Sequence, residues 1–101
     1  MAHRLVWLPD AIDDLDAIAA YIAIESEQYA KQFVERVSLR ADSLIEWPLS
    51  GHINPEANRE DIRELSVYPY RLIYRLTSDA VIVLAVLHGS RLIDVLLRSR
   101  M

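Results

Sequence analysis

Residues 61–91 decide the fold of this chain, and they read DIRELSVYPYRLIYRLTSDAVIVLAVLHGSR. Three runs rich in β-branched, aromatic and leucine residues follow one another here, at residues 62–67, 70–77 and 81–87. Short connections separate the runs, so we expect consecutive antiparallel strands. The last run is apolar at nearly every position, which is typical of a central strand that is covered on both faces.

Two helices are expected before these strands. Residues 3–8 first suit a short strand, and Pro9 then suits the first turn of a helix. The apolar residues that follow at helical spacing are Ile12, Leu15, Ile18, Ala19 and Ile22. Ser26 suits the N-cap of a second helix. Trp47 should end that helix, because the residue before a proline disfavours helical backbone.

The expected order of elements is β-α-α-β-β-β, with a loop over residues 48–60. This order predicts an α+β fold in which a helical hairpin packs on one face of a small, largely antiparallel sheet. A length of 101 residues fits one domain. We therefore expect residues 1–101 to form a single domain, with residues 90–101 as a C-terminal extension that is either a short helix or an extended arm.

Several kinds of site are excluded by the sequence. There is no cysteine, so disulfides and thiolate metal sites cannot form. His3 and His52 have no partners at metal-ligand spacing, and no phosphate loop or dinucleotide fingerprint occurs. We expect no metal and no cofactor. The longest apolar run, residues 80–87, is too short to cross a membrane, so we expect a cytoplasmic protein without membrane contact.

The net charge of −4 is unevenly distributed along the chain. Residues 1–47 have a net charge of −5 and residues 48–101 have a net charge of +1, and Lys31 is the only lysine. A general nucleic-acid binder is usually strongly basic. Any contact of this acidic chain with nucleic acid would therefore have to be local.

Arg71 and Arg75 are the first candidates for a binding role. They alternate with tyrosine and leucine along one strand, so they should lie on the sheet face that the helices do not cover. The planar guanidinium of arginine can bind two oxygens of a phosphate or carboxylate at once. Taken alone, ordinary ion pairs on a solvated strand face are the commoner explanation. Arg63 could join these residues or form an ion pair at the edge of the loop.

His88 is the second candidate, because it ends the last strand directly before Gly89. A histidine there could transfer a proton near neutral pH. Most histidines in such a position only hydrogen-bond a loop. The acidic cluster over residues 10–16 is better explained by its favourable interaction with a helix N-terminus than by a cation site.

The C-terminal extension is unusually apolar. Leu92, Val95 and Leu96 are among five apolar residues within residues 92–97. This is too many for a free terminus, so they should be covered by the rest of the domain or by a partner.

Four segments, in this order and spacing, resemble the RelE/ParE superfamily of bacterial type II toxin–antitoxin toxins. The opening strand and first helix of that superfamily resemble VWLPDAIDDLDAIAAYIA at residues 6–23. The loop after its second helix resembles EWPLSG at residues 46–51. Its three closing strands resemble IREL, YRLIYRL and VLAVLHGSR within residues 62–91.

The resemblance implies a toxin that is held inactive in a hetero-oligomer with an antitoxin encoded beside it. The antitoxin usually wraps a helix or an extended segment over the toxin. Two activities occur in the superfamily. The RelE-like branch cleaves mRNA in the ribosome with basic and polar side chains on the sheet, and the ParE-like branch is linked to poisoning of DNA gyrase.

The resemblance gives Arg71 and His88 the positions of an arginine and a C-terminal histidine that some RNA-cleaving members use. Gly89 stands where some nucleases have a tyrosine, and the lysines of other nucleases are missing. The acidic N-terminal half and the extension after residue 91 are also more similar to the ParE-like branch.

We therefore expect a ParE-like toxin that binds DNA gyrase and is not itself a hydrolase. The candidate target-binding residues are Arg63, Arg71, Arg75, His88 and Arg91. The candidate antitoxin-binding residues are Leu92, Val95 and Leu96. Two alternatives stay open. One is a ribosome-dependent mRNA endoribonuclease, in which Arg71 stabilises phosphate charge and His88 transfers a proton. The other is a non-toxic relative that survives as a binding or autoregulatory partner.

Overall fold

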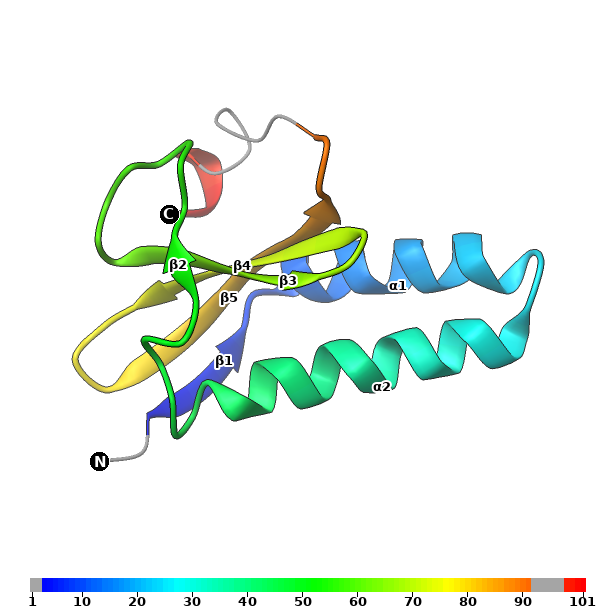
Figure 1. The fold of residues 1–101 in the computed structure, drawn as a ribbon, viewed down its shortest axis with the longest axis horizontal. Helices are drawn as coiled ribbons and strands as arrows, with labels where there is room; N and C mark the ends of the chain where they lie inside the picture. The colour runs from blue at the N-terminus through cyan, green and yellow to red at the C-terminus, as the bar shows by residue number, and fades with distance from the viewer. Residues whose placement is uncertain (1–2, 92–97) are drawn as a thin grey trace.

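The structure, a computed structural model, describes residues 3–91 and 98–101. Two helices form a hairpin that packs against a five-stranded sheet (Figure 1). The elements in chain order are β1 (Arg4–Trp7), α1 (Pro9–Ala23), α2 (Glu27–Ser43), β2 (His52–Ile53), β3 (Ile62–Val67), β4 (Tyr70–Leu76) and β5 (Ala80–His88). This architecture confirms the predicted α+β fold.

The strands lie in the order β1-β5-β4-β3-β2. β1 runs parallel to β5, whereas the other neighbouring pairs are antiparallel. β5 therefore lies between two strands, which accounts for its apolar sequence. The sequence did not predict β2. This strand of two residues lies inside the segment expected to be a loop, where His52 and Ile53 pair with Glu64 and Arg63.

The N-terminal end of α2 is as predicted, but its C-terminal end is not. The Oγ of Ser26 accepts a hydrogen bond of 3.1 Å from the backbone N–H of Tyr29, which caps the first turn. The regular helix ends at Ser43 instead of Trp47. The turn that follows is tighter, with backbone hydrogen bonds between residues three apart.

Apolar side chains fill both faces of the sheet. The first core lies between the helices and the sheet and contains Phe33 and Val37 of α2 with Leu72 and Tyr74 of β4. The second core lies on the opposite face. Its buried members are Ile62, Ile73, Leu84, Ala85 and Leu87, and Ala57 and Met101 pack against them. The second face is thus covered by a loop and by the C-terminal residues, without a helix of the hairpin.

The pairing of β4 with β5 is irregular at one position, which places two consecutive residues of β5 in the same core. The register shifts between Ile73 and Tyr74, which pair with Ala85 and Val83. Leu84 is the extra residue of this β-bulge. Because of the bulge, Leu84 and Ala85 both contribute to the second core, although they are consecutive residues.

A buried tyrosine fixes the loop after α2 to the sheet. The hydroxyl of Tyr74 donates to the carbonyl of Pro48 at 2.8 Å and accepts from the N–H of Gly51 at 3.0 Å. A Cβ atom on Gly51 would lie 2.5 Å from this hydroxyl and 2.6 Å from the carbonyl oxygen of Glu64, so only glycine fits. Burial raises the pKa of Tyr74 above its ordinary value, although the hydrogen bond from Gly51 opposes the shift.

The helical hairpin projects beyond the sheet at the connection between α1 and α2 (Figure 1). Tyr21, Ile24 and Tyr29 are exposed at this end. Within residues 3–91 and 98–101, no helix is both long enough and apolar enough to span a membrane.

Candidate functional site

Arg71 lies at the centre of a partly buried cluster of charged side chains on the second face of the sheet. In the pairing of β4 with β5, it lies opposite Leu87, a member of the second core. Its Nη1 and Nη2 donate to the two carboxylate oxygens of Glu56 at 2.8 and 2.7 Å. Its Nε and Nη2 donate to the two oxygens of Glu64 at 2.9 and 2.7 Å. These bonds use four of the five N–H groups that a guanidinium has.

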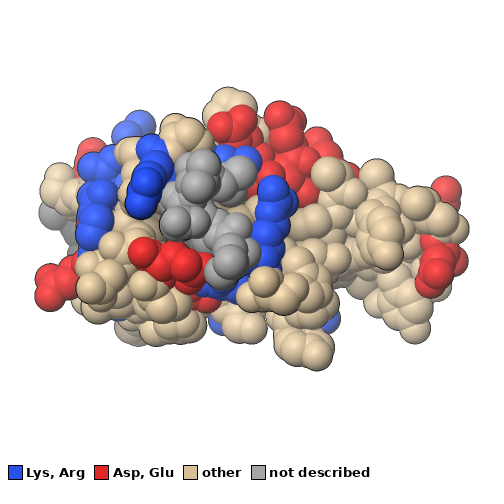
Figure 2. Space-filling view, turned by 90° about the horizontal axis from the view of Figure 1, so that it is seen from above, with Lys and Arg blue, Asp and Glu red and all other residues tan. Residues whose placement is uncertain are grey.

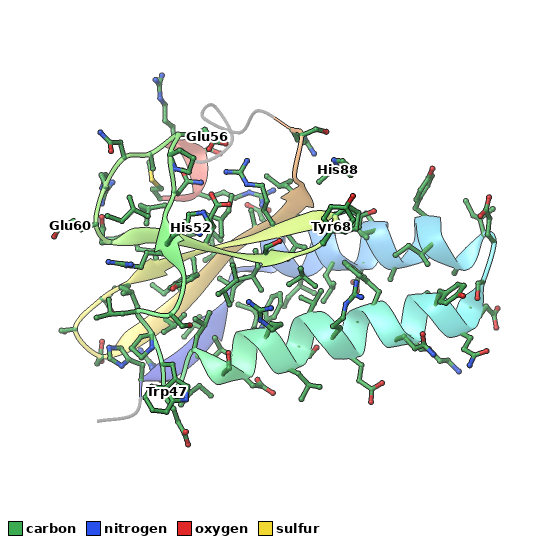
Figure 3. The ribbon with its side chains drawn as sticks, in the orientation of Figure 1. Trp47, His52, Glu56, Glu60, Tyr68 and His88 are labelled. Atoms are coloured by element: carbon green, nitrogen blue, oxygen red, sulfur yellow. The ribbon has the colours of Figure 1, made fainter. Side chains whose placement is uncertain are left out.

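The two carboxylates that bind Arg71 have different supports. Glu64 is a residue of β3, and its Oε1 also accepts a hydrogen bond of 2.9 Å from the Nδ2 of the buried Asn54. Glu56 lies on the loop between β2 and β3. Asn54 holds this loop, because its Oδ1 accepts a bond of 2.7 Å from the N–H of Ala57. The strand carboxylate is therefore held by β3, and the loop carboxylate is held through Asn54. Figure 3 labels Glu56 on this loop.

The electrostatics of the cluster favour the charged forms of Glu56 and Arg71. The Arg71 side chain is 14% exposed, and those of Glu56 and Glu64 are 18% and 7% exposed. Hydrogen bonds from Arg71 lower the pKa of Glu56, although burial opposes the shift. The two carboxylates, Glu64 first, raise the pKa of Arg71 further above its ordinary value. One guanidinium with two carboxylates leaves a net negative charge where an incoming phosphate would need a positive one.

His88 lies on the opposite side of the sheet from Arg71. In the pairing of β4 with β5, it lies opposite Tyr70. The two rings meet edge to face, with 5.6 Å between their centroids. Tyr70 in turn contacts Phe33 of α2 at 5.0 Å, which places this pair on the helix side. The Nδ1 of His88 accepts a bond of 3.2 Å from the N–H of Ser90 and lies 2.8 Å from its hydroxyl. His88 thus has the loop-bonding geometry that the sequence allowed.

The remaining candidate arginines do not gather at one place. Arg63 pairs with Tyr74 and so lies on the helix side, where it donates to the carbonyls of Gly51 and Glu60 at 2.9 and 3.1 Å. Arg75 shares the second face with Arg71. Its Nη1 donates to the carbonyl of Met101 at 3.0 Å, and its Nε lies 3.5 Å from a carboxylate oxygen of Asp61.

Arg91 is exposed at the end of the described part of the tail. Its backbone N–H donates to the carbonyl of His88 at 3.0 Å. In the space-filling view, basic side chains lie on the half of the molecule that contains the sheet, with acidic side chains among them (Figure 2). The candidate antitoxin-binding residues Leu92, Val95 and Leu96 lie outside the described residues.

The acidic partners of Arg71 were not among the predicted site residues. Glu64 could have been found, because it alternates in phase with Ile62 and so faces the same side as Arg71. Glu56 could not, since the path of the loop between β2 and β3 has no periodic signal. Among residues 3–91 and 98–101, no group of three His, Cys, Asp or Glu side chains could hold a metal ion.

A second ion pair binds the edge of β5 that β1 leaves unpaired. Beyond Val83, β1 no longer pairs with β5, so the backbone of this part of β5 needs other partners. Asp14 accepts from the N–H of Val86 at 3.1 Å, and Arg100 donates to the carbonyl of Leu84 at 3.0 Å. Arg100 Nη1 also lies 2.6 Å from Asp14 Oδ2. Interaction with the helix N-terminus alone does not account for Asp14.

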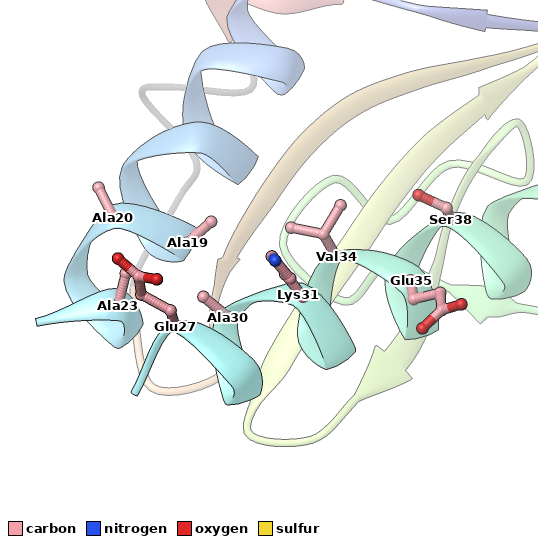
Figure 4. Close-up of a pocket in the computed structure, with 9 residues that line it drawn as sticks. All are labelled: Ala19, Ala20, Ala23, Glu27, Ala30, Lys31, Val34, Glu35 and Ser38. Carbon is pink, nitrogen blue, oxygen red and sulfur yellow. The ribbon is translucent and has the colours of Figure 1, made fainter. Parts of the chain in front are cut away.

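A shallow groove of about 690 Å³ runs between α1 and α2 (Figure 4). Small side chains from both helices leave it open, chiefly Ala19, Ala23 and Ala30. Lys31 and Glu35 stand beside it on α2. An apolar groove with charged borders can accept an amphipathic segment of a partner protein.

Comparisons with known proteins agree with this architecture. Residues 5–93 match the family described as the ParE toxin of type II toxin–antitoxin systems, parDE. A solved structure described as the chromosomal ParDE toxin–antitoxin system from P. aeruginosa has the same fold, with a TM-score of 0.70 and 21% identity. The match covers 86% of this chain and 96% of that one.

Two relatives share more of the sequence. The chain is 35% identical to a putative toxin, Y4kP, of Sinorhizobium fredii, over 85% of this chain and 88% of that protein. It is 33% identical to the toxin RelE2 of Caulobacter vibrioides, over 88% of this chain and 98% of that protein. On these matches, the chain belongs to the ParE toxin family of type II toxin–antitoxin systems, within the RelE/ParE superfamily.

Proposed function

We propose that this toxin poisons DNA gyrase in the cytoplasm by binding it, and that direct binding of a cognate antitoxin neutralises the toxin. One observation carries the choice of gyrase over RNA. Arg71, the arginine that the ribonuclease alternative requires, is held by two carboxylates at 2.7–2.9 Å. A guanidinium in that state is a poor ligand for a phosphate group.

The position of His88 supports the same choice. Cleavage of RNA needs charge stabilisation and proton transfer at the same phosphate. Arg71 pairs with Leu87 of the second core, whereas His88 packs on Tyr70 on the helix side. The two side chains thus point to opposite faces of the sheet, and a single phosphate would not meet both.

We place the gyrase contact at the end of the second face, around Arg91 and the tail. Arg91 and Arg98 are exposed and border the apolar residues 92–97 in the sequence. Exposed arginine beside apolar side chains is typical of protein–protein interfaces. Arg71 would not touch the target, because Glu56 and Glu64 already bind its guanidinium.

We place the antitoxin partly in the groove between α1 and α2. A helix or extended segment with alanine- or leucine-sized side chains would fill it, and Lys31 would meet an acidic residue at its border. Leu92, Val95 and Leu96 remain a predicted part of the antitoxin surface. Amide exchange with and without antitoxin tests both locations, and unchanged exchange at both would contradict them.

Two parallel assays test the proposed target. Purified toxin should inhibit supercoiling by DNA gyrase and should leave mRNA intact in a translating extract. Arg91→Ala should weaken the inhibition, whereas Arg40→Ala, which removes the same charge from the exposed side of α2, should not. Cleavage of translated mRNA without inhibition of gyrase would favour the endoribonuclease. Normal growth on induction without antitoxin would favour a non-toxic relative.

A further inference from the structure

A hollow on the second face lies directly over the outer edge of Arg71. Glu56, Glu64 and Arg71 line it together with Ser90 and Arg91. Gly89 also borders it, and a Cβ atom there would lie 3.9 Å from the Cγ and Cδ atoms of Arg71. Because glycine has no side chain, Gly89 leaves room beside the aliphatic part of Arg71.

The two carboxylates of the cluster are not equivalent. Glu64 is fixed on β3 and binds the Nε edge of Arg71, with Asn54 as a further donor. Glu56 binds the outer pair of nitrogens, Nη1 and Nη2, with one oxygen each. This two-pronged geometry is also the one in which arginine binds a phosphate. The carboxylate of Glu64 is enough to neutralise the guanidinium of Arg71. The carboxylate of Glu56 is therefore a second anion, bound where a ligand would be.

We propose that Arg71 forms a phosphate-binding site in which the carboxylate of Glu56 occupies the position of the phosphate. While Glu56 is charged, it therefore prevents phosphate groups from binding. The inference goes beyond the choice of target, since it concerns what the site would bind when Glu56 is neutral. The strand residues would keep the site in place, because the bonds from Arg71 and Asn54 to Glu64 do not involve Glu56.

The local charge agrees with this assignment. With Glu56 charged, the charges of Arg71 and Arg91 are balanced by those of Glu56 and Glu64. With Glu56 neutral, the same group has a net charge of +1. An oxyanion would then meet two guanidinium groups without a second carboxylate in front of it.

The test compares Glu56→Gln with Glu60→Gln. Both variants remove one negative charge from the same loop, but Glu60 is exposed and its backbone carbonyl, not its carboxylate, contacts Arg63. The probe is inorganic phosphate, and the readout is the NMR signal of the Nε–H group of Arg71, with that of Arg75 as an internal reference. Melting curves establish that each variant is folded at the assay temperature.

We expect a saturable shift of the Arg71 signal in Glu56→Gln, with phosphate affinity at least about tenfold higher than in wild type and in Glu60→Gln. Equal responses in all three proteins would overturn the proposal, as would no response in a folded Glu56→Gln. A second titration with a short single-stranded RNA separates the two sources of phosphate. A shift with both probes assigns the site to phosphate groups in general, and a shift with inorganic phosphate alone assigns it to the free dianion.

This outcome is independent of the target. Wild-type toxin that inhibits gyrase while Glu56→Gln fails to bind phosphate would retain the proposed function and remove the anion site. If wild-type toxin fails to inhibit gyrase while Glu56→Gln binds phosphate, the anion site would be retained and the proposed function would be removed.

Discussion

Replacement of Arg71 by methionine should destabilise the protein by about 3 kcal/mol near neutral pH. Methionine keeps an unbranched apolar stem in the second face but removes every N–H donor. Glu64, whose side chain is 7% exposed, would then lose its guanidinium partner and keep only Asn54 and the exposed His52, whose Nε2 lies 3.6 Å from Glu64 Oε2. Glu56 is on a loop and can turn towards water, so its loss of a partner costs less.

The magnitude follows from which group remains buried. Four charge-assisted hydrogen bonds at about 1.5–3 kcal/mol each would suggest a much larger loss. Most of that energy is recovered when the loop carboxylate is hydrated again, so the main cost is the charge on Glu64. Asn54 still donates to Glu64, which keeps the loss at the lower end of the range of about 3–5 kcal/mol for broken buried ion pairs.

The loss should depend on pH in a defined direction. The pKa of Glu56 in the folded protein is lowered from its ordinary value of 4.5 by the hydrogen bonds from Arg71. A lowered pKa in the folded state contributes stability above the ordinary pKa, and this stability is lost as the pH falls through the folded pKa. The difference between wild type and Arg71→Met should therefore be largest near neutral pH and should shrink below pH 4.5.

The difference in the free energy of unfolding is measured by urea unfolding, monitored by tryptophan fluorescence, near neutral pH and below pH 4.5. Arg75→Met is the matched control, because Arg75 is on the same face but is 37% exposed and has a 3.5 Å contact with Asp61. It should cost at most about 1 kcal/mol. Equal losses for Arg71→Met and Arg75→Met, or a loss for Arg71→Met that does not change with pH, would refute the reasoning.

Three further changes test the rest of the fold. Gly51→Ala should lower the free energy of unfolding by more than about 2 kcal/mol, because the new Cβ would overlap the Tyr74 hydroxyl and a backbone oxygen; a neutral result in urea unfolding would contradict this close approach. Tyr74→Phe should cost about 1–3 kcal/mol, since it leaves the Pro48 carbonyl and the Gly51 N–H without their partner. Burial raises the pKa of Tyr74, so wild type should lose stability as the pH rises above about 10, and Tyr74→Phe should lose less over that range. Asp14→Ala, which removes the acceptor, should speed amide exchange at Val86 while leaving exchange at Val81 unchanged, and equal exchange at Val86 in both proteins would argue against Asp14 as its partner.

The three closing strands and both helices could be predicted because their signals are local. The alternation of Arg71, Ile73 and Arg75 with larger apolar side chains fixes which face each residue occupies. β5 was predicted as a central strand from its continuous apolar run. The bulge at Leu84 was not, because a one-residue shift depends on packing against both cores and leaves no mark in the sequence.

The loop partner of Arg71 and the C-terminal partner of Asp14 could not be predicted for a different reason. Glu56 reaches Arg71 through a loop whose path depends on Asn54, and Arg100 reaches Asp14 from the other end of the chain. Contacts of this kind are set by the folded arrangement and not by spacing. The strand pattern placed Arg71 correctly on the second face, but whether its charge is free or paired required the structure.

The central claim is that Arg71 is a structural residue of a gyrase-binding toxin and not a catalytic group. The most direct measurement is inhibition of gyrase supercoiling by wild type and by a variant with Glu56→Gln, Glu64→Gln and Arg71→Met together. This variant removes the three charges of the cluster together, so that no buried charge is left without its partner. We predict equal inhibition by the two proteins. Wild type that leaves gyrase active but cuts translated mRNA, together with a folded variant that does neither, would contradict the account.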